Sequence, residues 1–296
     1  MTDICIVGAG PAGISAAIYA LRGGFSVTVV DSGTGALRKA DKVENYYGFP
    51  EAISGKQLAV NGIAQANRLG AAFLDDEAVA LAPHAEGFST ITAEGDEIVS
   101  RAVVLATGSP RKIPQIAGLA ALEGHGVSYC AVCDAFFYRS KDVVVLGFGE
   151  YAKAEALHLL PLVNSVTLLT NGKPQGADFP FEVKIIHEPL AQIAGEKRVE
   201  GVILADGRTI PADGVFVAYG AAGGSDLARK IGAIVEGTRI ITDEKGATNI
   251  PGLYAAGDCT GGTLQIAKAV YDGMNVGLSL VVFLRMNTQN QQAIGT

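Results

Sequence analysis

The feature that most constrains the fold is a strand, glycine turn, helix and strand pattern that occurs twice. The first glycines of the two copies, Gly8 and Gly147, are 139 residues apart. The first copy predicts a strand over 4–7, a helix over 14–21 and a strand over 27–30. The second predicts a strand over 143–146, a helix to about 160 and a strand over 166–169. Each copy is a βαβ unit, so the chain is expected to contain two nucleotide-binding folds.

The expected fold class is α/β, with two Rossmann-like dinucleotide-binding domains, the second inserted in the first. Pro110, Pro114 and Gly118 cluster before the cysteine region, and residues 246–252 precede the last glycine motif. We therefore expect residues 1–114 and 247–296 to form the first domain and 115–246 the second. The polar residues 287–296 are expected to fray.

Composition excludes several classes of protein. The net charge of −7 disfavours a nucleic-acid partner, because phosphate binding needs a basic surface. Residues 4–21 carry no charge, but their glycines and Pro11 break the stretch, so we expect neither a membrane span nor a signal peptide. Four cysteines in 296 residues are too few for a secreted disulfide framework. A cytoplasmic protein is expected.

The first glycine turn has the residue types that a dinucleotide pyrophosphate requires. In Gly8-Ala9-Gly10-Pro11-Ala12-Gly13, Gly8 permits the tight turn and Gly10 lets the backbone approach the phosphates. Gly13 lets the helix pack on the strand. Asp31 ends the next strand, where a carboxylate can accept hydrogen bonds from an adenosine ribose. The alternative is a tight turn without a nucleotide.

Cys130-Ala131-Val132-Cys133-Asp134 is the candidate for redox chemistry. Two thiols separated by two residues can close a disulfide on a helical turn, and Asp134 can donate or accept a proton beside them. A zinc site and a pair of inert thiols are the alternatives. Zinc needs four ligands, usually from a second close pair, so no metal is expected. Cys5 and Cys259 lie in apolar strands and are interpreted as buried small hydrophobes.

Two further segments extend the first motif. Residues 103–108 form an apolar strand ending in Ala106-Thr107-Gly108, and 252–259 form another that ends at Gly257-Asp258. Together with the first glycine turn they resemble the FAD signatures of the two-dinucleotide-domain flavoproteins. The resemblance implies that Asp258 binds the ribityl or pyrophosphate region of FAD. It also implies that Gln265, Ile266 and Ala267 open the last helix beneath the flavin pyrimidine.

A more specific resemblance lies around the cysteines. Residues 126–138, and 43–50 with Asn45, are similar to bacterial low-molecular-weight thioredoxin reductases. That family implies a homodimer with FAD in each subunit, Asn45 at the cofactor, and a dithiol on the inserted domain that reduces a thioredoxin-like disulfide. By the same resemblance Cys133 is the sulfur next to the flavin, Cys130 exchanges with the partner, and Asp134 is the matching acid.

The second glycine motif departs from that family. Phe148 is bulky where the family has glycine, and no arginine occurs between Arg139 and Arg198, although NADPH needs such a fork at its 2′-phosphate. Lys173 is the lone basic residue directly after the following strand, and residues 219–224 lack the family's His-x-Pro-Asn pattern. These departures make the chain similar to ferredoxin-dependent flavin thioredoxin reductases and to diflavin-linked disulfide oxidoreductases.

Three functional hypotheses follow. The first is an FAD-dependent disulfide oxidoreductase whose donor is ferredoxin, or a second flavin in or near the degenerate nucleotide site. The second is an ordinary NADPH-dependent thioredoxin reductase with an atypical site. The third is a flavin-binding redox sensor, which would respond once rather than turn over.

Overall fold

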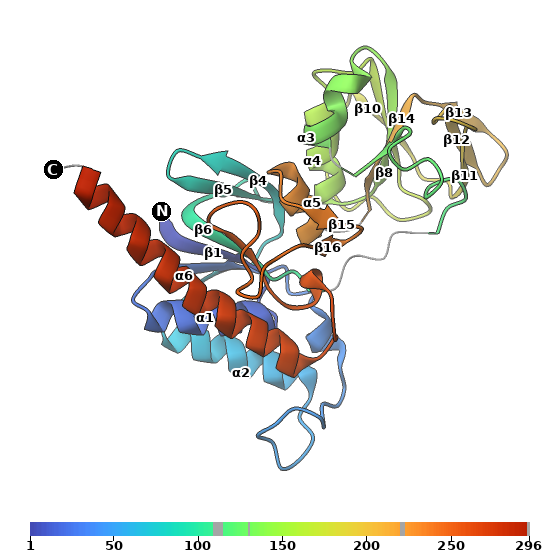
Figure 1. The fold of residues 1–296 in the computed structure, drawn as a ribbon. Coiled ribbons are helices and arrows are strands. Elements are labelled where there is room, and N and C mark those ends of the chain that lie inside the picture. Colours follow the sequence, from blue (N-terminus) through green and yellow to red (C-terminus); the bar gives the residue numbers. More distant parts are fainter. Residues whose placement is uncertain (109–114, 130, 220–222, 295–296) are drawn as a thin grey trace. The chain divides into compact units, whose positions relative to one another are not determined.

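The chain forms two compact units in a computed structural model that describes residues 1–108, 115–129, 131–219 and 223–294 (Figure 1). The side chains of residues 132, 133 and 290–294 are outside this description. The first unit comprises Met1–Pro110 and Gly223–Thr296, and the second comprises Arg111–Ala222. The second unit is thus inserted in the first, and the expected α/β class is confirmed, with parallel strand pairs in both units.

The sheet of the first unit is parallel on one side and antiparallel on the other. Its described strands run in the order β3-β2-β1-β6-β5-β4, with β17 paired to β6. β1 is parallel to β2 and β6, β2 to β3, and β17 to β6, whereas β4, β5 and β6 form an antiparallel meander. The strands are β1 (Thr2–Val7), β2 (Val27–Val30), β3 (Ala72–Leu74), β4 (Ala78–His84), β5 (Gly87–Thr92), β6 (Glu97–Leu105) and β17 (Leu253–Ala255).

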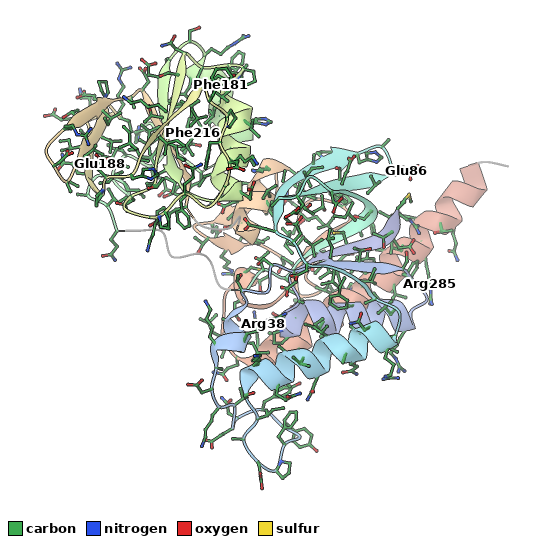
Figure 2. All side chains as sticks on the ribbon, turned by 180° about the vertical axis from the view of Figure 1, so that it is seen from behind. Arg38, Glu86, Phe181, Glu188, Phe216 and Arg285 are labelled. Carbon is green, nitrogen blue, oxygen red and sulfur yellow. The ribbon has the colours of Figure 1, made fainter. Side chains whose placement is uncertain are left out.

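Helices α1 (Pro11–Arg22) and α6 (Ile266–Ile294) pack closely together in this unit (Figure 1). A Cβ on Gly273 would collide with Ala12 O, and one on Gly277 would lie 2.7 Å from Tyr19 Cβ, so glycine allows the close approach. Arg285 of α6 donates to the carbonyl of Gly23 at 3.1 Å (Figure 2). The other helical elements are α2 (Gly55–Arg68), α5 (Gly224–Lys230), η1 (Ala36–Lys39) and η3 (Gly257–Thr260).

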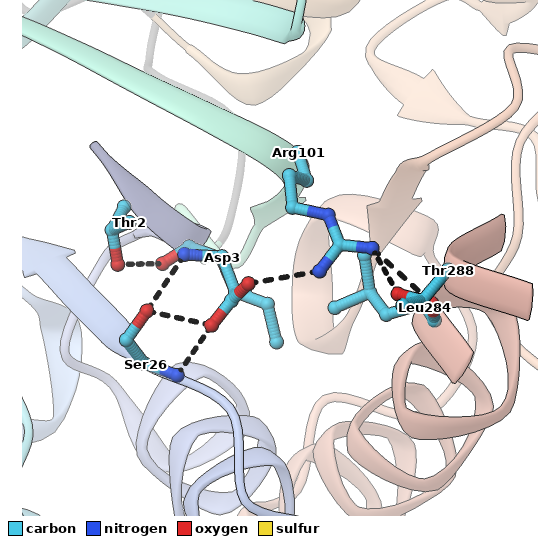
Figure 3. Close-up of polar contacts among 7 residues, drawn as sticks. Thr2, Asp3, Ser26, Arg101, Leu284 and Thr288 are labelled. Carbon is cyan, nitrogen blue, oxygen red and sulfur yellow. Dashed lines mark hydrogen bonds and ion pairs between the residues drawn. The ribbon is translucent and has the colours of Figure 1, made fainter. Parts of the chain in front are cut away.

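Arg101 fastens the far end of α6 to the sheet (Figure 3). Its guanidinium donates to Asp3 Oδ1 at 3.0 Å, to Leu284 O at 3.2 Å and to Thr288 Oγ1 at 2.8 Å. Partial burial raises the pKa of Asp3, but hydrogen bonds from Ser26 and Arg101 outweigh that effect and hold the pKa below 3.8. The carboxylate therefore contributes stability above its ordinary pKa, which is lost as the pH falls through the lowered value.

Replacing Arg101 with alanine is expected to lower the free energy of unfolding by about 1–3 kcal/mol, because three hydrogen bonds of a half-buried guanidinium are lost. Arg285→Ala, which removes an exposed arginine of the same helix, is expected to cost about 0.5 kcal/mol or less. Chemical denaturation of both variants measures the difference. The difference in the free energy of unfolding between wild type and Arg101→Ala should become smaller below pH 3.8, because Asp3 then becomes protonated. Equal losses in the two variants would contradict the role of Arg101.

The sheet of the second unit is parallel in its described part. Its order is β10-β9-β8-β14-β7, and an antiparallel sheet β11-β12-β13 accompanies it. The elements are β7 (Val127–Ser128), α3 (Ala131–Asp134), η2 (Ala135–Tyr138), β8 (Asp142–Gly147), α4 (Glu150–Leu159), β9 (Ser165–Leu169), β10 (Val183–Ile186), β11 (Leu190–Ala194), β12 (Gly201–Leu204), β13 (Thr209–Pro211) and β14 (Gly214–Ala218).

The chain returns to the first unit at Gly223, upstream of residue 247 where the sequence analysis placed the boundary. Residues 223–246 pack on the first unit: Gly224 N donates to Thr107 Oγ1 at 3.0 Å, and Lys230 Nζ to Val79 O at 3.2 Å. α5 is followed by the short hairpin β15 (Val235–Glu236) and β16 (Arg239–Ile240). α5, β15 and β16 are too short to show a clear hydrophobic periodicity in the sequence. The glycines from residue 246 onward are a more visible signal, and they placed the expected boundary too late in the chain.

Residues 287–296 were expected to fray. In the structure α6 continues through this stretch to Ile294, and Arg101 donates to Leu284 O and Thr288 Oγ1 near its start. By length and composition, one helix in the described part of the chain, Ile266–Gln289, could cross a membrane. In this structure its residues Ala269, Val276, Leu280 and Leu284 belong to the core of the first unit.

Candidate functional site

The first glycine turn has the geometry that the sequence predicts. Gly8 has φ +107°, and a Cβ there would collide with Ala106 O at the end of β6. A Cβ on Gly13 would collide with Gly8 O, whereas a Cβ on Gly10 would meet nothing within 4 Å. Gly8 and Gly13 therefore close the turn, and Gly10 leaves the space that a pyrophosphate requires. Pro11 is the first residue of α1, where its missing N–H costs no hydrogen bond.

Asp31 follows β2 and lies at this turn. Its Oδ1 accepts a hydrogen bond from Ala9 N at 3.1 Å, and its Oδ2 pairs with Arg38 of η1 at 2.9 Å (Figure 2). The carboxylate is thus held at the glycine turn, where the ribose of a dinucleotide would meet it. Sequence reasoning missed Arg38, because an arginine seven residues after the acid belongs to no motif.

The motifs that are distant in sequence meet in the first unit. Ala106 contacts the turn at Gly8, and Gly108 has φ +76°. A Cβ added to Gly257 would lie 2.9 Å from that of Ala12, so η3 begins against the first turn of α1. Asn45 Nδ2 donates to Gln265 Oε1 at 2.9 Å. Ile266 and Ala267 are the first residues of α6. Asp258 lies in η3 and Thr107 lies two residues after the end of β6, and both are half-buried.

Lys268 is a cation at this junction that sequence reasoning missed. Its Nζ donates to Gly257 O at 3.1 Å and Gly261 O at 2.7 Å, and it pairs with Asp272 at 2.7 Å. Asp272 also accepts a hydrogen bond from Gly257 N at 3.1 Å. This network fixes η3 to the first turn of α6, and the helix start adds a partial positive charge there.

The residues around the first glycine turn are chemically suited to bind FAD. The open space at Gly10, the start of α1 and the acceptor Asp31 are the parts that bind an adenosine pyrophosphate. Asn45 and Gln265 add amide donors and acceptors on one side of the α6 start. The first unit therefore has the donor set of a dinucleotide site.

The glycine turn of the second unit differs from the first. A Cβ on Gly147 would collide with Ala218 O and Ala152 Cβ, just as a Cβ on Gly8 would collide with Ala106 O in the first unit. A Cβ on Gly149, like one on Gly10, would meet nothing within 4 Å. Phe148 stands where the first turn has Ala9, and its ring meets Tyr219 edge to face, with centroids 5.0 Å apart. Gly176 N, from the loop after β9, donates to Phe148 O at 2.7 Å. The second unit therefore has a tight glycine turn, but the carbonyl of Phe148 in this turn is hydrogen-bonded by the loop that follows β9.

The end of β9 has no counterpart to Asp31. Thr170 Oγ1 donates to Lys173 O at 2.7 Å, and Asn171 Oδ1 accepts a hydrogen bond from Leu190 N at 2.8 Å. These side chains thus bond the loop around them. Lys173 is exposed and is the lone cation in the described loop 170–180. NADPH binding at this position needs paired donors for its 2′-phosphate, which this loop does not provide.

The cysteine segment for which redox chemistry is predicted continues into α3 of the second unit. Cys130 is outside the described residues, Cys133 belongs to α3 with its side chain undescribed, and Asp134 ends the helix. Asp134 Oδ2 accepts a hydrogen bond from Ser128 Oγ at 2.7 Å, which fixes the carboxylate at the end of α3. Partial burial and the charge of Asp134 raise the pKa of Tyr138.

Two buried polar side chains of helix α4 form hydrogen bonds with the backbone of Tyr129 and Ala131. Tyr151 Oη donates to Tyr129 O at 3.3 Å, and Glu155 Oε2 accepts a hydrogen bond from Ala131 N at 2.6 Å. Tyr151 and Glu155 are 0% and 2% exposed. They are four residues apart and so share one helix face. Sequence reasoning missed both, although a glutamate within an alanine- and leucine-rich helix face was a visible signal.

An exposed aromatic pair follows α3. Phe136 and Phe137 of η2 are 66% and 68% exposed, and their rings are 6.2 Å apart in an edge-to-face arrangement. The guanidinium of Arg139 lies 5.4 Å from the Phe136 ring centroid. Adjacent exposed phenylalanines form an apolar area of the kind that is typical of protein-binding surfaces.

Cys5 and Cys259 are buried, as expected. Burial raises the pKa of each thiol to about 11. Cys259 Sγ also donates to Leu105 O at 3.2 Å. Because the thiolate is the reactive form, both cysteines are poor nucleophiles at neutral pH.

We therefore expect Cys5 and Cys259 to be alkylated slowly in the native, chemically reduced protein, whereas Cys130 and Cys133 supply the fast-reacting thiols. Mass spectrometry after a short pulse of iodoacetamide at pH 8 measures this. Denatured protein is the control, since all four cysteines should then react. Rapid native labelling of Cys5 or Cys259 would contradict the buried placement.

Comparison with known proteins gives similarity over nearly the whole chain. The family model described as pyridine nucleotide-disulphide oxidoreductase matches residues 2–178 and 180–273. A thioredoxin reductase from Listeria monocytogenes is 32% identical over 294 residues, covering 92% of this chain and 90% of that protein.

Two solved structures are also similar. The atypical thioredoxin reductase TRi from Desulfovibrio vulgaris Hildenborough has a TM-score of 0.90 and 37% identity, covering 97% of this chain and 99% of that one. A ferredoxin-flavin thioredoxin reductase from Clostridium acetobutylicum has a TM-score of 0.73 and 34% identity, covering 96% and 98%.

Proposed function

This chain belongs to the pyridine nucleotide-disulphide oxidoreductase family and is a flavoprotein disulfide reductase of the thioredoxin-reductase type; we propose that ferredoxin or a second flavin, rather than NADPH, supplies its electrons. The contrast between the two glycine turns carries the proposal. The first turn has its acceptor, Asp31, in place, whereas the loop after β9 bonds its own polar side chains and offers Lys173 alone.

We assign FAD to the first unit. Gly8, Gly10, Pro11, Ala12 and Gly13 would hold the pyrophosphate, and Asp31 the ribose. The flavin would be contacted by the residues that meet around the start of α6 and the end of β6: Asn45, Ala106, Thr107, Gly108, Gly257, Asp258, Gln265, Ile266 and Ala267. FAD supplies a two-electron carrier when bound.

The second unit then carries the dithiol on a degenerate pyridine-nucleotide-like fold. Two electrons and one proton reach the Cys130–Cys133 disulfide, its S–S bond breaks, and one thiol and one thiolate form. Cys133 would be the sulfur that receives the electrons from the flavin, and Asp134 would exchange the proton. Cys130 then attacks the disulfide of a thioredoxin-like protein, and Cys133 resolves the mixed disulfide, which releases the reduced partner.

The exposed Phe136 and Phe137 support a protein substrate, because they place apolar surface next to α3, which carries Cys133. One solved relative supports the choice of donor, because it is a ferredoxin-flavin thioredoxin reductase that is 34% identical to this chain. An NADPH-dependent enzyme is the second candidate, favoured by the open space at Gly149 and by the family's description.

We also propose a homodimer. Tyr271, Leu278, Val282 and Met286 are exposed apolar residues on α6, and their spacing of seven, four and four places them on one helix face. A second copy would cover this face, and light scattering should give twice the chain mass. We propose a cytoplasmic location, since a dithiol that must be kept reduced requires a reducing compartment.

Flavin stoichiometry and nucleotide binding test the choice of donor. One flavin per chain supports ferredoxin, and two support the second-flavin variant. Equilibrium dialysis of the oxidised enzyme against NADPH is expected to show no saturable binding up to about 1 mM. A dissociation constant of about 1 mM corresponds to a binding free energy of only about 4 kcal/mol. Saturation in the micromolar range would contradict the proposal and favour the NADPH-dependent enzyme.

A further inference from the structure

The turn formed by residues 257–262 connects two segments that we assign to the flavin. Residues 257–258 begin this turn in η3, and residues 265–267 follow it around the start of α6. Gly257, Gly261 and Gly262 have φ angles of +82°, +77° and +80°. A backbone with these angles cannot continue as a regular helix or strand, so its peptide groups need hydrogen-bond partners from elsewhere in the chain.

Lys268 supplies such partners with one ammonium group. Its Nζ donates to Gly261 O at 2.7 Å, to Gly257 O at 3.1 Å and to Thr260 Oγ1 at 3.2 Å. Thr260 Oγ1 itself donates to Gly257 O at 2.8 Å, so the lysine is bonded to both ends of η3. Because Lys268 directly follows residues 265–267, a single side chain joins the two segments that we assign to the flavin.

Asp272, one helical turn further along α6, completes the arrangement. Its Oδ2 pairs with Lys268 Nζ at 2.7 Å and accepts a hydrogen bond from Gly257 N at 3.1 Å. Lys268 thus binds the carbonyl of Gly257, and Asp272 binds its amide. The side chains of the pair are only 25% and 20% exposed, so water competes for these hydrogen bonds only in part.

We propose that Lys268 and Asp272 are positioning residues that hold residues 257–258 against the start of α6 and thereby determine how tightly FAD is retained. Each acts through the backbone of the turn and does not touch the cofactor. The inference rests on the assignment of FAD to the first unit and is independent of the electron donor.

A positioning role and a direct charge effect predict opposite results for Asp272. If the pair acted on the anionic pyrophosphate of FAD through its charges, removing the carboxylate charge would remove a repulsion and tighten binding. If the pair positions the turn, the same change loosens Lys268 and the amide of Gly257, and binding becomes weaker. Added salt would diminish a charge effect, because it screens partly exposed charges, whereas it should change a positioning effect little.

The test compares four variants with the wild-type holoenzyme. Lys268→Met keeps the length of the side chain but removes its donors, and Asp272→Asn keeps an acceptor oxygen but removes the charge. The double variant measures their coupling, and Lys245→Met is the control at an exposed lysine of the same unit. The dissociation constant of FAD is measured by flavin fluorescence on dilution, at low and at high salt. Visible circular dichroism at saturating FAD reports the surroundings of the bound flavin, and far-UV circular dichroism reports folding.

Lys268→Met is expected to weaken FAD binding by about 30-fold and Asp272→Asn by about fivefold, because hydrogen bonds of charged groups to the turn are lost. The double variant should bind at least about threefold more tightly than the product of the two effects predicts, because both residues hold the same peptide unit. These ratios should change less than about twofold with salt. The visible spectrum of the flavin bound to Lys268→Met should differ from that of the wild type, whereas Lys245→Met should match the wild type in every measurement.

Tighter or unchanged FAD binding in Asp272→Asn would overturn the proposal, and so would independent effects in the double variant. Folded Lys268→Met with the affinity and flavin spectrum of the wild type would also overturn it. If Lys268→Met does not fold, the direction of the change in Asp272→Asn and its response to salt decide the question. A wild-type protein that binds no flavin would instead contradict the proposed function.

Discussion

Replacing Cys133 with serine is expected to abolish catalytic reduction of a thioredoxin-like disulfide, by about a thousandfold or more, while FAD remains bound. Serine cannot form the Cys130–Cys133 disulfide, so electrons have no acceptor between the flavin and the protein partner. The residues that we assign to FAD lie in the first unit, whereas Cys133 lies on α3 in the second, so the substitution should leave the flavin spectrum and occupancy unchanged. Multiple-turnover assays with thioredoxin and absorbance of the bound flavin measure the two effects separately.

Cys5→Ala is the matched control, because Cys5 is a buried cysteine on β1 with a pKa raised to about 11. It should retain the turnover of the wild type. Turnover that survives in Cys133→Ser would remove this cysteine from the electron path. A wild-type enzyme that reacts once and then stops would favour the redox-sensor hypothesis over the reductase.

Replacing Asp31 with alanine is expected to weaken FAD binding by about 10- to 150-fold. The carboxylate fixes the glycine turn through Ala9 N and is the acceptor offered to the ribose, and a hydrogen bond to a charged group contributes about 1.5–3 kcal/mol. Release of the flavin on dilution, measured by its fluorescence, gives the dissociation constant.

Asp41→Ala is the control for this substitution, since Asp41 is an exposed aspartate ten residues further along the chain. Its FAD affinity should equal that of the wild type. If Asp31→Ala bound FAD as tightly as Asp41→Ala, the assignment of Asp31 to the ribose would be wrong.

The βαβ units were predictable because their signals are local. The succession of an apolar strand, glycines and an apolar helix marked β1-α1-β2 and β8-α4-β9 within about three residues of their bounds. The structural roles of Gly8 and Gly13 could be predicted, because a tight turn and close packing of the helix on the strand both require glycine. The burial of Cys5 followed from its apolar strand, β1, whereas Cys259 is buried in η3 and not in the strand that the sequence led us to expect.

The side chains that arrive from elsewhere in the chain could not be predicted. Arg38 reaches Asp31, Lys268 reaches the carbonyl of Gly257, and Glu155 reaches Ala131 N. Each of these contacts depends on tertiary packing that places a helix or turn beside a motif, and no spacing in the sequence records it. The return of the chain at Gly223 was missed for a related reason, since α5 is defined by its packing on β4 rather than by a periodic pattern.

We propose that electrons enter this enzyme without a pyridine nucleotide, and anaerobic reduction of the bound flavin tests this choice of donor. NADPH, NADH and chemically reduced ferredoxin are added to separate samples of the oxidised enzyme, and bleaching of the flavin absorbance is followed over time. We predict rapid bleaching by ferredoxin and none by either nucleotide on the timescale of turnover. Rapid bleaching by NADPH would contradict the claim, because the second glycine turn would then bind and deliver the nucleotide despite Phe148 and the loop bonded to it.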